Sequence, residues 1–252
     1  MPPGAESENA NDCRVTLWPV SRLTAGAGRL TMVTNMFTGL VETIGKVVSA
    51  ERAGAGLRLR VDLGRAAEGV RLGDSISLGG ICQTVAALDG TVAAFDAVAE
   101  TLARTTMGGW QAGTRVNIER SLRPSDRMGG HFVAGHVDAT GRILENRERA
   151  DGWWLRIEAP ADLFAEIVAK GSIAIDGISL TVVEAKVPEF SVTLIPTTLR
   201  ETTLGDRAAG DLVNLETDLL AKYVRRAVAA LAGPDESNRR LLDALGRSGF
   251  ID

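Results

Sequence analysis

The alternation of apolar and polar residues predicts short β-strands along most of the chain. The segment LRLRVDL (57–63) alternates with a period of two, and WLRIEA (154–159) shows the same pattern later in the chain. Such alternation gives a strand one face for a core and one for solvent. Further strands are predicted at TVAAFDAV (91–98), VNIER (116–120), EFSVTLI (189–195) and VNLET (213–217).

The strand pattern occurs twice, which indicates a tandem duplication. GDSISLGGICQTV (73–85) corresponds to GSIAIDGISLTV (171–182), so that Thr84 pairs with Thr181 at an offset of 97. The same offset aligns TLARTTMG (101–108) with TLRETTLG (198–205), and VNIE with VNLE. Upstream, Val41 pairs with Val137 at an offset of 96. Three segments in one register and a period this long predict two similar domains rather than a stacked solenoid.

Each copy contains about six strand signals, enough to close a small barrel and remove its exposed edges. Gly80 and Gly177 mark the bend between two strands in each copy. The predicted fold is mainly β, with two tandem six-stranded antiparallel Greek-key β-barrels and a C-terminal amphipathic helix. The expected parts are a disordered extension (1–35), two barrels (36–132 and 133–218), a helix for self-association (219–233) and a tail (234–252).

Two helices are predicted outside the strand pattern. Ala161 to Lys170 follows Pro160 and precedes Gly171, which are good start and stop signals. Residues 219–232 place Leu220, Tyr223 and Val224 with other apolar residues on one face. This second helix has no partner in the repeat, so its apolar face is expected to meet the same helix of other subunits. The tail is expected to hold one more short helix, capped around residues 235–237.

Composition narrows the classes of function. The chain has 252 residues and a net charge of −4, which does not favour a nucleic-acid backbone or an anionic membrane. No apolar run approaches the ~20 residues that span a bilayer. Only Cys13 and Cys82 could form a disulfide, so a disulfide framework is excluded and a cytoplasmic location is expected.

Five motifs follow one another from Met36 to about Arg226: MFTGLVETIG, GGHFVAGHVD, DGISLTV, IPTTLRETTLG and VNLETDLLAKYV. Together they resemble one known family, the riboflavin synthase α chain. The resemblance implies a homotrimer that converts two molecules of 6,7-dimethyl-8-ribityllumazine into riboflavin and 5-amino-6-ribitylamino-2,4-pyrimidinedione. It implies no metal and no redox cofactor, and it allows an association with lumazine synthase. The implied active site pairs the N-terminal barrel of one subunit with the C-terminal barrel of a neighbour.

The resemblance also implies roles for individual residues. The expected catalytic residues are Cys82, His136, Ser179 and Asp218, with His131 a weaker candidate. The expected substrate-binding residues are Phe37, Thr84, Lys170, Thr181, Ile195 and Thr198, of which Ile195 would cover the ring.

Each role has an ordinary structural alternative. Cys82 could be a buried small hydrophobe, and either histidine could be merely structural. Ser179 and Thr181 share one face of a strand, which could simply be the solvent face. Asp218 could be the N-cap of the terminal helix, and Lys170 could complement a helix dipole.

Three positions depart from the family pattern. The family usually has Asn at the position of Gly79, Leu at that of Gln83 and often Ser at that of Ala134. All three are expected in or beside the N-terminal half-site. Because of these three departures, a second function remains an alternative: that of a non-catalytic lumazine- or flavin-binding protein like the bioluminescence antenna proteins. A flavoprotein reductase is disfavoured, because no G-x-G-x-x-G segment follows a strand.

Overall fold

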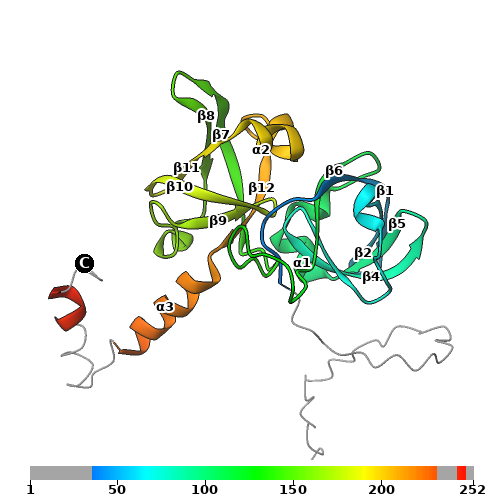
Figure 1. Ribbon diagram of the computed structural model, residues 1–252, viewed down its shortest axis with the longest axis horizontal. Helices are drawn as coiled ribbons and strands as arrows, with labels where there is room; N and C mark the ends of the chain where they lie inside the picture. The colour runs from blue at the N-terminus through cyan, green and yellow to red at the C-terminus, as the bar shows by residue number, and fades with distance from the viewer. Residues whose placement is uncertain (1–35, 232–242, 248–252) are drawn as a thin grey trace, which may run out of the picture. The chain divides into compact units, whose positions relative to one another are not determined.

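The computed structural model describes residues 36–231 and 243–247, and most of them lie in two closed β-barrels (Figure 1). The first barrel, here the N-barrel, closes in the strand order β1-β2-β5-β4-β3-β6 with antiparallel neighbours. Its β2, β5, β4 and β3 form a Greek key, as predicted. The strands are β1 (Thr43–Ala53), β2 (Gly56–Asp62), β3 (Ser75–Leu78), β4 (Ile81–Asp89), β5 (Val92–Ala97) and β6 (Arg115–Arg120).

The second barrel, here the C-barrel, repeats this topology in the order β10-β11-β8-β7-β12-β9. The predicted internal duplication is therefore confirmed at the level of strand order. The strands are β7 (Ala139–Arg149), β8 (Gly152–Glu158), β9 (Ser172–Ile175), β10 (Ile178–Lys186), β11 (Glu189–Leu194) and β12 (Leu212–Thr217).

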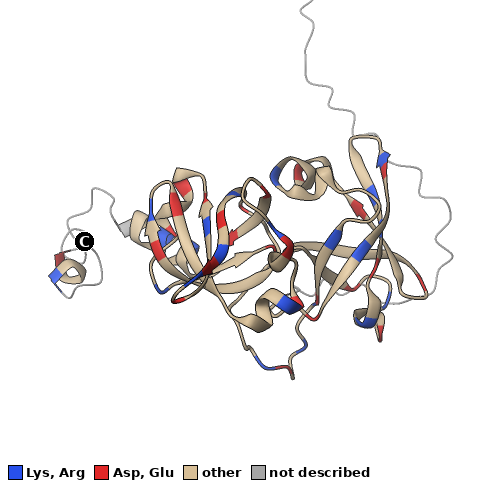
Figure 2. Ribbon diagram, turned by 90° about the horizontal axis from the view of Figure 1, so that it is seen from above, with Lys and Arg blue, Asp and Glu red and all other residues tan. Residues whose placement is uncertain are grey.

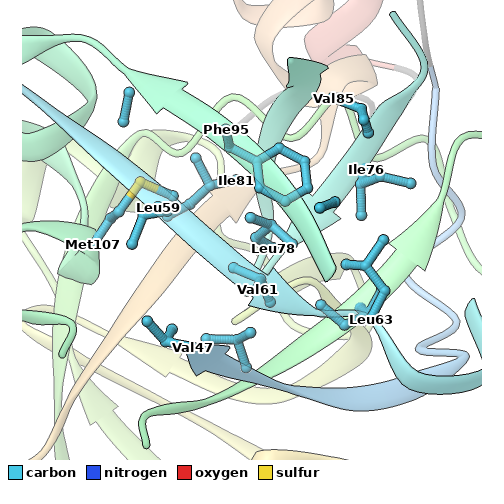
Figure 3. Packing of buried hydrophobic residues seen from close by; sticks show 14 of the residues in the cluster. Val47, Leu59, Val61, Leu63, Ile76, Leu78, Ile81, Val85, Phe95 and Met107 are labelled. Atoms are coloured by element: carbon cyan, nitrogen blue, oxygen red, sulfur yellow. The ribbon is translucent and has the colours of Figure 1, made fainter. Parts of the chain in front are cut away.

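Each barrel has its own hydrophobic core, built from the inward positions of the alternating strands. Leu59, Val61, Leu78 and Phe95 of the N-barrel are completely buried and converge from β2, β3 and β5 (Figure 3). A separate cluster fills the C-barrel, with Leu155, Ile157 and Val192 among its members. Each copy of the repeat therefore has a hydrophobic core of its own.

Short helices cover one end of each barrel at the repeated TLARTTMG and TLRETTLG segments, where sequence analysis assigned no structure. In the N-barrel they are α1 (Ala99–Arg104) and the 3-10 helix η2 (Thr106–Gly109). In the C-barrel they are α2 (Pro196–Glu201) and η4 (Thr203–Asp206). The remaining 3-10 helices are η1 (Gly64–Ala67) and η3 (Ala161–Ala165). Each helix in the repeat is too short to show helical periodicity.

The predicted helix from Ala161 to Lys170 is wrong in extent. Only η3 forms, and residues 166–170 then turn back toward β10. Lys170 adopts a left-handed φ of 65°, and its N–H donates to the Val182 carbonyl at 2.8 Å. The backbone at Lys170 thus hydrogen-bonds to a strand of the barrel and does not continue the helix.

The predicted terminal helix is confirmed as α3 (Leu219–Leu231). Its base is tied to the C-barrel by the ion pairs Lys222–Asp138 (2.7 Å) and Arg225–Glu166 (2.8 Å). Leu220, Tyr223 and Val224 are exposed, so the described chain leaves the predicted apolar face uncovered. Residues 243–247 are also helical, whereas the predicted cap at 235–237 and the predicted disordered extension 1–35 lie outside the described residues.

Two asparagines of the repeated VNIE and VNLE motifs join the barrels in a pseudo-symmetric way. The Asn117 side-chain amide donates to the Asp176 carbonyl at 2.9 Å, and that of Asn214 donates to the Gly79 carbonyl at 2.8 Å. Their amide oxygens accept from the Thr203 and Thr106 N–H groups, respectively. Gly79 and Asp176 occupy equivalent hairpin turns, with φ of 54° and 45°. Gly79 therefore lies in the contact between barrels.

Basic and acidic residues are interspersed along the strands (Figure 2). Many form exposed pairs such as Arg58–Asp96, at 2.8 Å. Exposed pairs of this kind contribute little to stability. In the part of the chain that the structure describes, no helix is long and apolar enough to cross a membrane.

Candidate functional site

Two short segments exchange between the barrels and form the centre of the candidate site. Residues 37–41 precede the N-barrel but lie on the C-barrel, where Ser179 N–H donates to the Gly39 carbonyl at 2.8 Å. Residues 133–137 precede the C-barrel but lie on the N-barrel, where Cys82 N–H donates to the Gly135 carbonyl at 2.9 Å. We call these the crossing segments. Val41 accordingly packs on the C-barrel core and Val137 on the N-barrel core.

The crossing segments meet each other at their centre. Phe37 and Val133 pair as an antiparallel bridge through two backbone hydrogen bonds of 2.8 and 3.1 Å. Both side chains are completely buried, and the half-buried Cys82 packs against them. Phe37, expected to bind substrate, is thus placed within the contact between the barrels.

The glycines of the crossing segments are required by how closely they approach the opposite barrel. Gly39 and Gly135 have φ of 75° and 76°, in the left-handed region. A Cβ atom on Gly39 would lie 2.6 Å from the Ser179 Cβ, and one on Gly135 would lie 2.6 Å from the Cys82 Cβ. The backbone therefore reaches the two candidate residues at a distance that no larger residue permits.

Two buried glutamates hold the crossing segments in place. Glu119, at the end of β6, accepts hydrogen bonds from the Thr38 N–H and hydroxyl, both at 2.7 Å, and from the Gly39 N–H at 3.0 Å. Glu216, at the end of β12, accepts from the Ala134 N–H at 2.7 Å and the Gly135 N–H at 2.9 Å. Burial raises the pKa of Glu119 to about 7 against the opposing effect of its donors, and it raises that of Glu216 as well. Sequence analysis missed both residues, although each lies within a repeated motif.

In the C-barrel, Ser179 lies beside the histidine that sequence analysis ranked lower. His131 Nδ1 is 2.7 Å from the Ser179 hydroxyl oxygen. His131 is only 9% exposed, and its Nε2 has no hydrogen-bond partner among the described residues. Burial lowers the His131 pKa, and the carboxylate of Asp218 partly opposes this shift. The imidazole is therefore neutral near pH 7 and can accept a proton from the serine hydroxyl.

His136, the preferred histidine at the sequence level, lies elsewhere. It follows Gly135 in the crossing segment on the N-barrel, and its side chain is exposed. The two histidines thus belong to different barrels, His131 to the C-barrel site and His136 to the N-barrel site. Their spacing of five residues gave no indication of this separation.

Asp218 acts as the cap of the terminal helix, the structural alternative considered for it. Its Oδ1 accepts from the Leu220 N–H at 2.9 Å. The charge of the same carboxylate raises the pKa of His131 against the larger effect of burial. The cap and a role in the site are therefore compatible, and the carboxylate can stabilise a protonated His131.

In the N-barrel, Cys82 takes the position that Ser179 takes in the C-barrel. Burial raises the pKa of the Cys82 thiol, and a hydrogen bond from Ser75 opposes this. The thiol is therefore neutral at pH 7. Thr84 lies two residues further along β4 and is exposed on the same face. Gln83 is buried on the opposite face, between core residues, and its amide donates to the Cys82 carbonyl. Gln83 therefore does not lie on the face of β4 where a substrate could contact it, and the expected direct effect of this residue on substrate binding is not supported.

The remaining predicted residues belong to the C-barrel and differ in exposure. Thr181 is exposed on the same face of β10, as the spacing of two predicts. Lys170 is exposed in the turn before β9 and is not at a helix terminus, which removes its structural alternative. Ile195 is the N-cap residue that precedes α2 and is 64% exposed, and Thr198 is half-buried in that helix. An apolar side chain left this exposed fits a surface that another molecule covers.

A cleft in the described part of the chain does not include these residues. It has a volume of about 540 Å³ and opens between β3, β6 and residues 121–127 of the N-barrel. Thr38 and Glu119 line it, as do Ser75 and Ser121, the N-barrel counterparts of Ser172 and Asp218. The candidate residues lie instead on open barrel faces. Among the described residues, no three His, Cys, Asp or Glu side chains are placed to hold a metal ion.

Comparison with known proteins gives two matches to one domain model. The model, described as a lumazine binding domain, matches residues 38–121 and 134–218. A riboflavin synthase of Mycobacterium tuberculosis is 45% identical over 196 residues, covering 76% of this chain and 97% of the relative. Those of Brucella abortus (43%, covering 76% and 97%) and Actinobacillus pleuropneumoniae (37%, covering 85% and 100%) are also similar.

Solved structures confirm the fold. LumP in complex with riboflavin superimposes with a TM-score of 0.65 at 25% identity, covering 72% of this chain and 99% of LumP. LumP in complex with 6,7-dimethyl-8-(1'-D-ribityl) lumazine gives a TM-score of 0.66 at 23% identity, with the same coverage.

Proposed function

We propose that this chain, which belongs to the riboflavin synthase family, brings two substrate molecules together between the N-barrel of one subunit and the C-barrel of another. It is an enzyme of the riboflavin synthase type. Its reaction takes two molecules of 6,7-dimethyl-8-ribityllumazine and transfers a four-carbon unit from one to the other. The products are riboflavin and 5-amino-6-ribitylamino-2,4-pyrimidinedione, so the carbons that one ring system gains are those that the other loses.

The hydrogen bond between Ser179 and His131 is the observation that carries the assignment of the reacting groups. The reaction must remove a proton from a ring methyl group of one lumazine. In the proposed step, the Ser179 oxygen takes this proton while its own proton moves to Nδ1 of the neutral His131. The Asp218 carboxylate then stabilises the imidazolium. The negative charge left on the substrate spreads into its ring system.

The N-barrel provides the second half-site in this proposal. Cys82 and Thr84 would contact the other lumazine on the open face of β4, and the exposed His136 would lie next to it. Cys82 enters as a neutral thiol that can add to the ring or contact it. Thr181, Thr198, Lys170 and Ile195 would hold the lumazine on the C-barrel. The two barrels differ at the reactive position, serine against cysteine, which fits a division between donor and acceptor.

The assembly that we propose is a homotrimer in which α3 joins the subunits. The exposed apolar residues Leu220, Tyr223 and Val224 support it, since this face is uncovered in the described chain. Neither half-site is enclosed within one chain, which also favours a site completed by a second subunit. A reducing location such as the cytoplasm suits the free thiol of Cys82. An association with lumazine synthase stays a prediction.

The test is to incubate the purified protein with 6,7-dimethyl-8-ribityllumazine alone and to follow riboflavin by absorbance. One mole of riboflavin for every two moles of substrate consumed is the expected result. Tight binding of the lumazine without any product would contradict the enzymatic function. It would make the chain a binding protein and would direct attention to Ala134 in the N-barrel half-site.

A further inference from the structure

We propose that Glu119 and Glu216 are reciprocal positioning residues, each of which fixes the reactive strand of the opposite barrel through a crossing segment. Glu119 belongs to the N-barrel but acts on Ser179 of the C-barrel. Glu216 belongs to the C-barrel but acts on Cys82 of the N-barrel. The roles of Ser179 and Cys82 rest on the proposed function, whereas the mechanical connection rests on the contacts alone.

The connection consists of two hydrogen bonds in series. On one side, the Glu119 carboxylate accepts from the Gly39 N–H at 3.0 Å, and the Gly39 carbonyl accepts from the Ser179 N–H at 2.8 Å. On the other, Glu216 accepts from the Gly135 N–H at 2.9 Å, and the Gly135 carbonyl accepts from the Cys82 N–H at 2.9 Å. Both glutamates are at most 5% exposed. Above about pH 7, where Glu119 is ionised, a buried carboxylate that accepts several N–H groups fixes its donors more firmly than a neutral acceptor does.

The two connections differ by one donor. The Thr38 hydroxyl gives Glu119 a third hydrogen bond, at 2.7 Å. The equivalent residue on the other side is Ala134, which has no hydroxyl to offer Glu216. Alanine at position 134, where the family often has serine, therefore removes one hydrogen bond that would hold the crossing segment on the N-barrel. It does not remove a contact to the substrate. We infer that Cys82 is held less firmly than Ser179.

Labelling of Cys82 tests the proposal without turnover, which keeps its outcome separate from that of the catalytic assignment. In a Cys13→Ser background, Cys82 is the sole thiol. We expect Glu216→Gln to increase the rate of Cys82 labelling by a small-molecule thiol reagent about tenfold, because a charged hydrogen bond is lost. The rates are compared as the limiting values at high pH, where the thiol is fully ionised, because the Glu216 charge also raises the pKa of Cys82. Glu119→Gln, the matched control, should change the labelling rate much less, because the segment that it holds reaches Cys82 only through the packing of Phe37, and it should reduce kcat more than it changes KM.

If Glu216→Gln fails to fold, a variant that adds a hydrogen bond tests the same proposal. Ala134→Ser supplies the missing donor and should slow Cys82 labelling about two- to threefold. Thr38→Ala, its counterpart on the other side, should leave labelling unchanged and lower kcat. Equal acceleration of labelling by both glutamate variants would overturn the reciprocal arrangement, as would a labelling rate that Ala134→Ser leaves unaltered.

Discussion

Replacing Ser179 by alanine is expected to lower kcat by roughly a hundredfold or more and to change KM by less than about threefold. The hydroxyl lies 2.7 Å from Nδ1 of a buried, neutral imidazole, where it can relay a proton during the reaction. It contributes little to holding the substrate before the proton moves. Steady-state kinetics with the lumazine as sole substrate measure both constants.

The partner residue provides a sharper form of this test. His131→Gln should cost about as much as Ser179→Ala, and the double variant little more, because residues that act as a unit are strongly non-additive. Thr193→Ala, an exposed change on β11 of the same barrel, is the control and should be silent. If the fold-reduction in kcat of the double variant equals the product of the two single reductions, the two residues act separately. Parallel losses in kcat/KM and binding would make Ser179 a residue that positions the ligand.

Ending the chain at Asp218 is expected to convert a trimer into monomers and to abolish nearly all activity. The truncation removes α3 and with it the exposed apolar residues Leu220, Tyr223 and Val224. Activity should fall by more than about a hundredfold, because reactants that are no longer held together lose the advantage of proximity. Sedimentation velocity gives the assembly state, and the lumazine assay gives the activity.

Two further variants control for effects of the truncation on folding. A chain that ends at Leu231 keeps α3 and should remain trimeric and active. Leu220→Asp with Val224→Asp keeps the whole chain and places charge on the apolar face, so it should dissociate as the truncation does. A trimer that persists without α3 would show that the subunits associate through another surface.

The repeat allowed most of the fold to be predicted. Alternation and turn signals indicated about six strands in each copy, and the offset of 97 placed VNIE and VNLE at equivalent positions of two similar units. Local pattern sufficed because each strand buries one face in the core of its own barrel. It failed at residues 161–170, where η3 ends at Ala165 and the Lys170 N–H donates to the Val182 carbonyl. That contact joins the turn before β9 to β10 and leaves no periodic signal.

The site was predictable only in part, for a similar reason. The spacing of Ser179 and Thr181 placed both on one face, and the structure agrees. The exchange of crossing segments is a long-range feature, however, and nothing in the alignment of Val41 with Val137 indicates that each packs on the other barrel. His131 gained its importance from a contact with Ser179 across 48 positions of sequence. Glu119 and Glu216 read as ordinary strand residues until their buried partners were seen.

Complementation between two inactive variants tests most directly whether the half-sites come from different subunits. Ser179→Ala inactivates the C-barrel, and Thr84→Arg blocks the open face of β4 in the N-barrel. Trimers that contain both variants, obtained by co-expression, should be much more active than either parent, because an intact N-barrel then meets an intact C-barrel across the subunit contact. Mixed trimers as inactive as their parents would contradict the account and would place both substrates on one chain.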